Sequence, residues 1–325
     1  MPTPLAGKRI LDLGALSGSW PHALAISMAA KLCAGYGALV HRPRSPEGEP
    51  FALAPPLLPD GRSALDVFLN RGKSLVTGPY DAAIGTPELL AQEAKSIPVK
   101  VRISTFAPER DAPATELSLL ALSGLLGLVG ESGGPPARLA GHQLAYAAGL
   151  AANTGLLAAL LAGGEEMVDV SLFDVAVSLN WKLPASLLML GVAPERGNPR
   201  NHWVTMPARD GHIALVYQDK DWPALRAMVG DPRLEDACFG SMMSRGQNWK
   251  RLIGILEPWF RARTRREITT DAQRRRIPIG PVLFPQELLK DAQYIARGFL
   301  LSDGTPQLPL VWDGSRIAWE VSCVA

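Results

Sequence analysis

Basic and small residues stand where the first predicted strands of the chain end, a placement typical of phosphate-binding sites. A glycine turn follows the first strand and opens a helix, whose N-terminus favours anions. A basic residue ends the second strand, and two cations with an amide precede the third. Together these groups could grip several phosphates, although a solvated turn is the simpler explanation for the third segment taken alone. The residues predicted to bind a phosphorylated ligand are Ser17, Gly18, Arg42, Asn70, Arg71 and Lys73.

The residues after the second predicted strand argue against two common nucleotide sites. The turn at 14–19 resembles the first motif of S-adenosylmethionine methyltransferases and, more weakly, a dinucleotide loop. Both sites need an acidic residue after the second strand to bind ribose hydroxyls. His41, Arg42 and Pro43 stand there instead. This basic strand end suits a phosphate, so NAD, FAD and S-adenosylmethionine are not expected.

Alternating apolar segments predict an α/β protein with a parallel sheet. Two strands with a helix between them, within ~35 residues, make a βαβ unit. The expected strands are 8–13, 38–40, 74–77, 99–104 and 167–170, and the expected helices are 21–34, 117–128 and 146–162. The last two helices are apolar on every face, so they belong in the core or at a subunit interface.

A more polar region follows Gly197 and predicts a second, smaller α+β unit. Asp210 and Gly211 lie between two strand-like segments, which predicts a hairpin. Amphipathic helices are expected at 222–229, 249–261 and 265–276. Several arginines cluster here, and a solvated helical face with local ion pairs is a simpler explanation than a contact with an anion. They are Arg261, Arg263, Arg265, Arg266 and Arg274–Arg276.

Composition is that of an ordinary globular protein. The chain has 325 residues, 47% hydrophobic and 20% charged, and its net charge of +2 gives no reason to expect nucleic acid. Cys33, Cys238 and Cys323 fit neither a disulfide framework nor a metal site, and no apolar signal stretch opens the chain. The uncharged segment 145–164 could span a membrane by length, but its small residues favour a helix buried between a sheet and another helix.

Short motifs in a fixed order resemble the family III CoA-transferases, the group of carnitine dehydratase and bile-acid-inducible proteins. These motifs are Pro4–Leu13, Val40–Pro43, Asn70–Ser74, Ala121–Leu126, Gly141–Gln143, Ala147–Leu150, Val168–Leu172, Pro278–Val282, Glu287–Gln293 and Ala296–Gly298. The resemblance implies a large Rossmann-like domain built from both chain ends, a smaller α+β domain, and a dimer of interlocked rings. The implied divisions are 1–197 for the large CoA-binding domain, 198–300 for the small domain and 301–325 for a return segment.

The resemblance also implies chemistry on CoA thioesters. In the family an aspartate carboxylate attacks an acyl-CoA thioester and forms a mixed anhydride, and the CoA thiolate then returns onto a second carboxylic acid. Alignment of the motifs around it puts Ala145 at the position of this aspartate. The histidine and aspartate of the racemase branch are missing as well. The remaining candidates are Glu116 and His142, although a structural role near a dimer contact is the simpler explanation for His142.

A CoA-contacting segment of the family is also altered. Its usual Asn-Phe-Arg-Pro-Gly sequence is compressed here to residues 84–88, and the usual last helix does not follow 308–312. We therefore expect a CoA-transferase-like enzyme that binds acyl-CoA and transfers CoA between carboxylic acids, or performs related isomerase or lyase chemistry. The alternative is a non-catalytic subunit that pairs with an aspartate-bearing paralogue.

These expectations extend to ligands and partners. Acyl-CoA would be a substrate, together with a carboxylic acid, and neither a tightly bound cofactor nor a metal is expected. The protein would be cytoplasmic and dimeric, either as a homodimer or with a paralogous subunit. No nucleic acid and no membrane are expected as partners.

Overall fold

The computed structural model describes residues 3–74, 77–107, 112–131, 133–192, 196, 203–300, 311–312 and 315–316. The chain forms two compact units. Unit 1 comprises Met1–Gly130, Gly134–Pro194 and Ile295–Ala325, and unit 2 comprises Glu131–Gly133 and Glu195–Tyr294. Each unit has a hydrophobic core of its own. The domain boundaries predicted at residues 197 and 300 stay predictions, because the return segment is described only in β9 (Val311–Trp312) and β10 (Ser315–Arg316).

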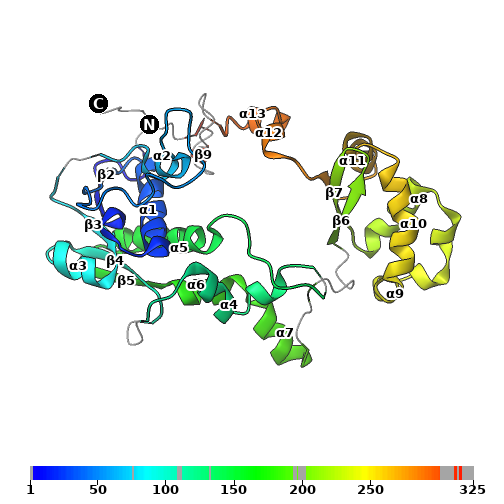
Figure 1. Ribbon diagram of the computed structural model, residues 1–325, viewed down its shortest axis with the longest axis horizontal. Helices are drawn as coiled ribbons and strands as arrows, with labels where there is room; N and C mark the ends of the chain where they lie inside the picture. Colours follow the sequence, from blue (N-terminus) through cyan, green and yellow to red (C-terminus); the bar gives the residue numbers. More distant parts are fainter. Residues whose placement is uncertain are drawn as a thin grey trace. The chain divides into compact units, whose positions relative to one another are not determined.

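Unit 1 is built on a sheet of five parallel strands in the order β2-β1-β3-β4-β5 (Figure 1). These strands are β1 (Arg9–Asp12), β2 (Leu39–His41), β3 (Ala82–Gly85), β4 (Val99–Ser104) and β5 (Glu166–Ser171). Ile10 pairs with Val40 on one side and with Ala82 on the other, so β1 lies between β2 and β3. The predicted α/β class with a parallel sheet is confirmed.

Helices cover both faces of this sheet. α1 (Trp20–Gly35) and α5 (Gln143–Ala162) pack on one face, and α3 (Pro87–Glu93) packs on the other. Successive side chains of a strand point to opposite faces, which explains the two layers. Ile10 belongs to the larger core under α1, whereas Leu11 belongs to the smaller core under α3.

The long apolar helix α5 is a core helix of unit 1. Among the described helices, α5 alone is long and apolar enough to cross a membrane. Its inner side packs on β4, β5 and α1, and Asn153 Nδ2 donates a hydrogen bond to the carbonyl oxygen of Ala29. Gly149 permits the close approach, because a Cβ atom there would lie 2.7 Å from Cβ of Met28. Its outer side is exposed within this unit, up to 90% at Leu161. The expectation that other elements cover this helix on every face is therefore not met within unit 1.

Two expected elements of unit 1 differ in the structure. The strand expected at 74–77 is present among the described residues only as a bridge between Ser74 and His41, and the third strand is Ala82–Gly85. Its small residues gave a weak strand signal, yet all four are buried in the sheet. The helix expected at 117–128 is broken, because Gly124 adopts a φ of 80° after α4 (Glu116–Leu122).

Four further helices belong wholly or partly to unit 1. They are α2 (Ala64–Asn70), α6 (Leu172–Leu179), α7 (Lys182–Leu190) and α13 (Ala292–Ala296), the last of which ends unit 2 and re-enters unit 1. α2, α4 and α6 each begin at a Ser or Thr whose side-chain oxygen accepts a hydrogen bond from a first-turn amide. Local capping therefore fixes where each of these helices starts.

Unit 2 is a smaller α+β unit. Its antiparallel sheet has the order β6-β7-β8, and β6 (Trp203–Ala208) and β7 (Gly211–Val216) form the expected hairpin. The other elements are β8 (Ile279–Pro281), α8 (Trp222–Val229), α9 (Met242–Gln247), α10 (Trp249–Arg261), α11 (Arg265–Arg274) and α12 (Pro285–Leu288). Arg245 is fully buried in this core, where it contacts the faces of Tyr217 and Trp222.

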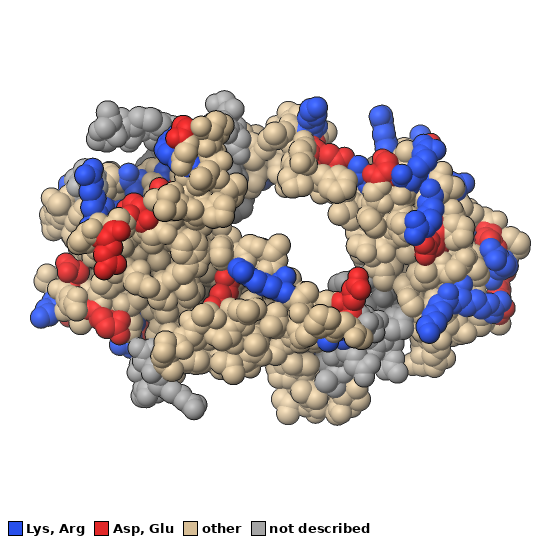
Figure 2. Space-filling model, in the orientation of Figure 1, with Lys and Arg blue, Asp and Glu red and all other residues tan. Residues whose placement is uncertain are grey.

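Three of the seven arginines that cluster in unit 2 form ion pairs, in line with the simpler explanation. Positive and negative side chains are intermixed over this unit (Figure 2). Arg261 pairs with Glu257, and Arg275 pairs with Asp271, each across one helical turn. Arg265 joins Asp210 of the hairpin to Glu287 of α12. These pairs neutralise the arginines that take part in them.

Candidate functional site

The carboxyl ends of three neighbouring strands of unit 1 open into a cavity of about 510 Å³. The chain leaves β1 toward β2 on one side and returns to β3 on the other. Ligands of open parallel sheets bind at such a reversal of strand order. The segments after β1, β3 and β4 line the cavity, and they include Ser17, Gly18, Ser19, Thr86, Ser104 and Thr105.

Hydroxyl groups and an imidazole give this cavity a hydrogen-bonding wall. Nδ1 of His22, in the first turn of α1, lies 2.7 Å from Oγ of Ser19, and Nε2 lies 3.4 Å from Oγ1 of Thr105. Among the described lining residues, Glu88 is the only acid and none is Lys or Arg. The wall therefore suits a neutral polar part of a ligand better than its phosphates.

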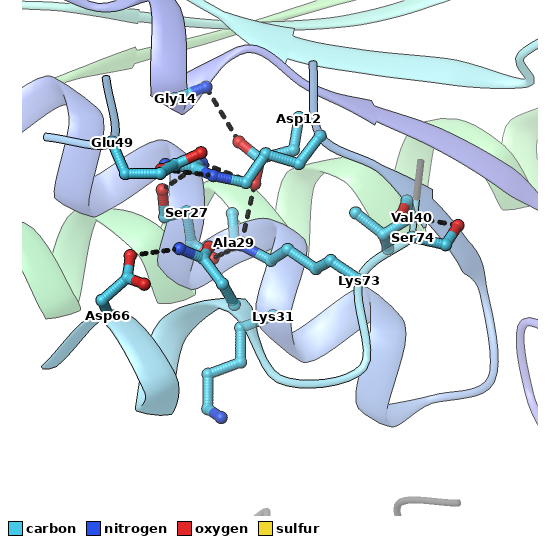
Figure 3. Close-up of polar contacts among 12 residues, drawn as sticks. Asp12, Gly14, Ser27, Ala29, Lys31, Val40, Glu49, Asp66, Lys73 and Ser74 are labelled. Carbon is cyan, nitrogen blue, oxygen red and sulfur yellow. Dashed lines mark hydrogen bonds and ion pairs between the residues drawn. The ribbon is translucent and has the colours of Figure 1, made fainter. Parts of the chain in front are cut away.

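A cluster of charged and polar side chains, most of them buried and here called the Asp12 cluster, lies at the end of β1 (Figure 3). Its members are Asp12, Ser27, Arg42, Glu49, Asn70 and Lys73. Asp12 is fully buried, and its Oδ2 accepts from Nη1 of Arg42 at 3.1 Å and from Nζ of Lys73 at 2.8 Å. The backbone N–H of Gly14 donates to Oδ1 at 2.8 Å. The cluster therefore joins β1, α1, the end of β2 and the segment after α2.

Lys73 is completely coordinated by the protein. An ammonium has three hydrogens to donate. Those of Lys73 point to Oδ2 of Asp12, to the carbonyl oxygen of Ser27 at 2.9 Å and to Oδ1 of Asn70 at 3.2 Å. Asn70 is held in turn by Asp66, which accepts from its Nδ2 at 2.7 Å. A ligand could bind Lys73 only by replacing one of these partners.

The charge states of Asp12 and Lys73 depend on two opposing effects, which are burial and ion pairing. Burial would raise the pKa of Asp12, but Lys73 and Arg42 oppose it and hold that pKa at about 2. Burial lowers the pKa of Lys73 to about 8, because the attraction to Asp12 offsets only part of the free energy that the ammonium loses when water is removed. Both partners are therefore charged at neutral pH.

A second buried lysine lies nearby on α1. Burial, and then repulsion by Lys73 and Arg71, lowers the pKa of Lys31 to about 6. Its Nζ donates to the carbonyl oxygen of Phe68 and lies 4.0 Å from the centroid of the Phe68 ring. Lys31 is therefore mainly neutral at pH 7.

A carboxylate and an imidazole meet at the start of α5. Glu116 is buried, and its Oε1 accepts from the backbone N–H of Leu144 at 3.1 Å. Its Oε2 lies 3.0 Å from Nδ1 of His142, whose side chain is 26% exposed. Ala145, which the motif alignment predicts at the position of the family's aspartate, directly follows Leu144 in the first turn of α5 and is fully buried. Glu116 thus places a carboxylate beside the helix end that carries Ala145.

Aromatic rings flank this pair. The rings of Trp20 and His142 lie 5.8 Å apart, and the ring of Phe51 meets Trp20 edge-on at 5.0 Å. Tyr146 is one turn into α5, and burial, together with the charge of Glu116, raises its pKa. The surroundings of Glu116 are therefore partly apolar, while His142 and the half-exposed Arg138, whose Nη2 lies 3.8 Å from Oε2, stand on its polar side.

The predicted site residues fall into three groups, with Arg71 apart from them. Ser17 and Gly18 line the cavity, Arg42, Asn70 and Lys73 meet in the Asp12 cluster, and Arg71 stands at the end of α2. The remaining two, Glu116 and His142, contact each other. Their roles in binding CoA or in catalysis stay predictions.

The sequence analysis missed three members of the cluster, which are Asp12, Ser27 and Glu49. A signal existed only for Asp12, because a carboxylate that ends a buried apolar strand needs a cation nearby. Ser27 lies inside an apolar helix, and Glu49 lies in a segment without regular structure. Nothing in their spacing indicates a contact with Arg42.

The sequence model of CoA-transferase family III matches residues 86–320. This chain belongs to CoA-transferase family III. The match covers β4, β5, α5 and the whole of unit 2, so the predicted membership is confirmed. The Asp12 cluster lies before the matched range, in the segment whose motifs resemble the family.

Three curated relatives are CoA-transferases of bacteria. A "Probable CoA-transferase" of Mycobacterium tuberculosis is 25% identical over 67% of this chain and 30% of its own length. The succinyl-CoA–D-citramalate CoA-transferase of Chloroflexus aurantiacus is 24% identical over 94% of this chain and 85% of its own. The succinyl-CoA:(R)-benzylsuccinate CoA-transferase subunit BbsE of Thauera aromatica is 29% identical over 58% of this chain and 50% of its own. The chain thus spans half or less of the length of two of these family III relatives.

A solved structure shares the fold. The CAIB/BAIF family protein from Brucella suis matches 99% of this chain and 96% of its own, with a TM-score of 0.83 and 20% identity. The likeness supports the α/β architecture of the family III fold over the length of the chain.

Proposed function

We propose that this family III protein binds acyl-CoA and transfers CoA between carboxylic acids, with Glu116 supplying the carboxylate that position 145 lacks. The observation that supports this is the placement of the Glu116 carboxylate at the start of α5, 3.1 Å from the backbone N–H of Leu144. A carboxylate held next to position 145 could take over the task of an aspartate at that position. Both of its oxygens are held: Oε1 accepts from Leu144, and Oε2 lies 3.0 Å from Nδ1 of His142 and 3.8 Å from Nη2 of Arg138.

The first step needs only this carboxylate and the thioester. An oxygen of Glu116 attacks the thioester carbonyl carbon, the carbon–sulfur bond breaks, and CoA leaves as its thiolate. The product is a mixed anhydride between Glu116 and the acyl group. His142 Nδ1 lies 3.0 Å from Oε2, so it orients the carboxylate through one oxygen while the other attacks. The thiolate then attacks the Glu116 carbonyl carbon of the anhydride, which releases the first carboxylic acid and leaves CoA bound to Glu116 as a thioester. A second carboxylate attacks this thioester and forms a new anhydride with Glu116, and the released thiolate attacks the acceptor's carbonyl carbon, which gives the new acyl-CoA and the free Glu116 carboxylate.

The cavity at the strand ends is the proposed place for a neutral part of CoA. Ser17 and Gly18 line it, and Ala114, two residues before Glu116, stands at its edge. Arg42 and Lys73 would lie on the side of the phosphates. We place the protein in the cytoplasm as a dimer, in keeping with its family.

Trapping of an acyl-enzyme tests this function. Incubation of the protein with succinyl-CoA and hydroxylamine should give a hydroxamate at Glu116, located by mass spectrometry of peptides. Glu116→Gln should abolish CoA exchange, and the exposed Glu93→Gln is the matched control that should keep it. CoA exchange that persists in Glu116→Gln would show that Glu116 is not the nucleophile.

A second function is favoured by one relative. The Thauera aromatica protein is a subunit of its CoA-transferase, and Ala145 leaves the usual nucleophile out of this chain. The chain could therefore pair with an aspartate-bearing paralogue and contribute structure and part of a CoA pocket. In that case the purified chain would be inactive, and co-expression with the paralogue would restore exchange that Glu116→Gln does not affect.

A further inference from the structure

The guanidinium of Arg42 is enclosed by protein groups on nearly every side. An arginine has five N–H hydrogens. Nη1 donates to Oδ2 of Asp12 at 3.1 Å and to Oγ of Ser27 at 2.9 Å, and Nε and Nη2 donate to Oε2 of Glu49 at 3.2 and 2.8 Å. These four bonds leave one hydrogen unassigned. Because the side chain is also only 6% exposed, a phosphate can make the two bonds of a bidentate contact with Arg42 only after one partner has moved.

The two carboxylates on Arg42 differ in how they are held. The side chain of Asp12 is fully buried and also binds Lys73 and Gly14. The side chain of Glu49 is 33% exposed, and it reaches Arg42 from the solvent side. Glu49 is therefore the partner that can leave without exposing a buried charge.

The surroundings of Glu49 favour its release. It lies between β2 and α2, in a segment without helix or strand. Two residues later the buried ring of Phe51 anchors this segment against Trp20, so the Glu49 side chain can turn out while the backbone stays. Glu49 also repels Asp66, whose pKa is raised by burial and then by the Glu49 charge. Its departure would relieve that repulsion.

We infer that Glu49 is a displaceable counter-ion, which a phosphate group of a CoA ligand replaces on Arg42. The inference rests on the proposed binding of acyl-CoA and adds a residue that sets its affinity. A phosphate offers the same charge-assisted bonds as the carboxylate, with more acceptor oxygens. The ligand must compete with Glu49, so its apparent affinity is lower than that of an open Arg42. Ligands without phosphate do not meet this competition.

Calorimetric titration of the whole 325-residue chain tests the inference with two probes, CoA and the phosphate-free pantetheine. Glu49→Gln keeps the shape of the side chain and removes its charge. It should bind CoA about tenfold more tightly than the wild type, with pantetheine affinity unchanged. Glu47→Gln, an exposed position in the same segment, is the matched control and should behave as the wild type. Glu49→Ala should show the same gain in CoA affinity, which would exclude the introduced glutamine amide as the cause of tighter binding.

The outcomes separate the two proposals. Equal CoA affinity in Glu49→Gln and Glu47→Gln, or weaker binding in Glu49→Gln, would overturn the counter-ion role while leaving acyl-CoA binding in place. If neither the wild type nor any variant binds CoA, the proposed function is wrong, and the inference that rests on it is wrong as well. Thermal unfolding of each variant shows whether it is folded before titration.

Discussion

Nζ of Lys73 lies 2.8 Å from Oδ2 of Asp12, although 61 residues separate them in sequence and both side chains are almost completely buried. Removing one partner of such a pair leaves the other charge buried without full compensation. Lys73→Met should therefore lower the free energy of unfolding by about 3–5 kcal/mol. Urea unfolding followed by circular dichroism measures the loss.

The exposed pair of Lys8 and Asp81 provides the control for this prediction. Its side chains are 44% and 35% exposed, so Lys8→Met should cost less than about 1 kcal/mol. Similar small losses in both variants would show that the Asp12 cluster does not stabilise unit 1.

Acid should weaken the fold through Asp12. Its pKa is about 2 in the folded protein and has its ordinary value of 3.8 when unfolded. The unfolded state thus takes up a proton first, and the stabilisation by Asp12, complete above pH 4, is lost as the pH falls toward 2. Unfolding of the wild type and Asp12→Asn at successive pH values should show a stability gap that narrows over this interval. A constant gap would contradict the depressed pKa.

Lys31 should have the opposite effect on the pH dependence. Its pKa is about 6 in the folded protein against an ordinary 10.5, so between these values only the unfolded state holds the proton. Burial of Lys31 therefore costs most below pH 6, and stability rises as the pH increases toward 10.5. Lys31→Met should stabilise the protein at pH 7 by about 2 kcal/mol, with a smaller gain at pH 9. Thermal unfolding at both pH values checks this.

A restored aspartate should not restore the usual chemistry. Ala145 is fully buried beside the helix end that already carries Glu116. Ala145→Asp would place a second carboxylate next to the first, and we expect a loss of about 2 kcal/mol in stability without a gain in CoA exchange. Exchange that appears in Ala145→Asp and survives Glu116→Gln would instead mark the site as one that lacks only the family's nucleophile.

The close packing of α1 on α5 depends on a glycine, Gly149, at the contact. A methyl group at Gly149 would lie 2.7 Å from Cβ of Met28 and 2.9 Å from the carbonyl oxygen of Ala25, so Gly149→Ala should cost about 1–3 kcal/mol. Gly254 in α10 has open space around its missing Cβ, and Gly254→Ala should stabilise by about 0.5–1 kcal/mol. Denaturant midpoints of the two variants should therefore move in opposite directions.

Much of the fold was predictable because local patterns agreed with it. The strand 99–104, the helices 222–229 and 249–261 and the Asp-Gly hairpin match the structure. β3 was not predicted, since Ala82 and Ala83 have little strand propensity and owe their place to pairing on both sides. Tertiary context decided that strand.

The candidate site was predictable only as separate pieces. The residues Arg42 and Lys73 stood out by charge, and their common partner Asp12 did not, because contacts across 30 and 61 residues leave no periodic trace in the sequence. The same holds for Glu116 and His142, which motif alignment singled out without indicating that they touch. Charge types are visible in a sequence, whereas pairings depend on the folded chain.

The position of the Asp12 cluster bears on how the chain can be divided. The family match begins at residue 86, after β1, β2, β3 and every member of the cluster. A fragment that started there would keep β4 and β5 alone of the parallel sheet and would strip α5 of its partner helix α1. The matched range is therefore not a domain that could fold without the first 85 residues. Those residues contribute three of the five parallel strands and helix α1 to the core of unit 1.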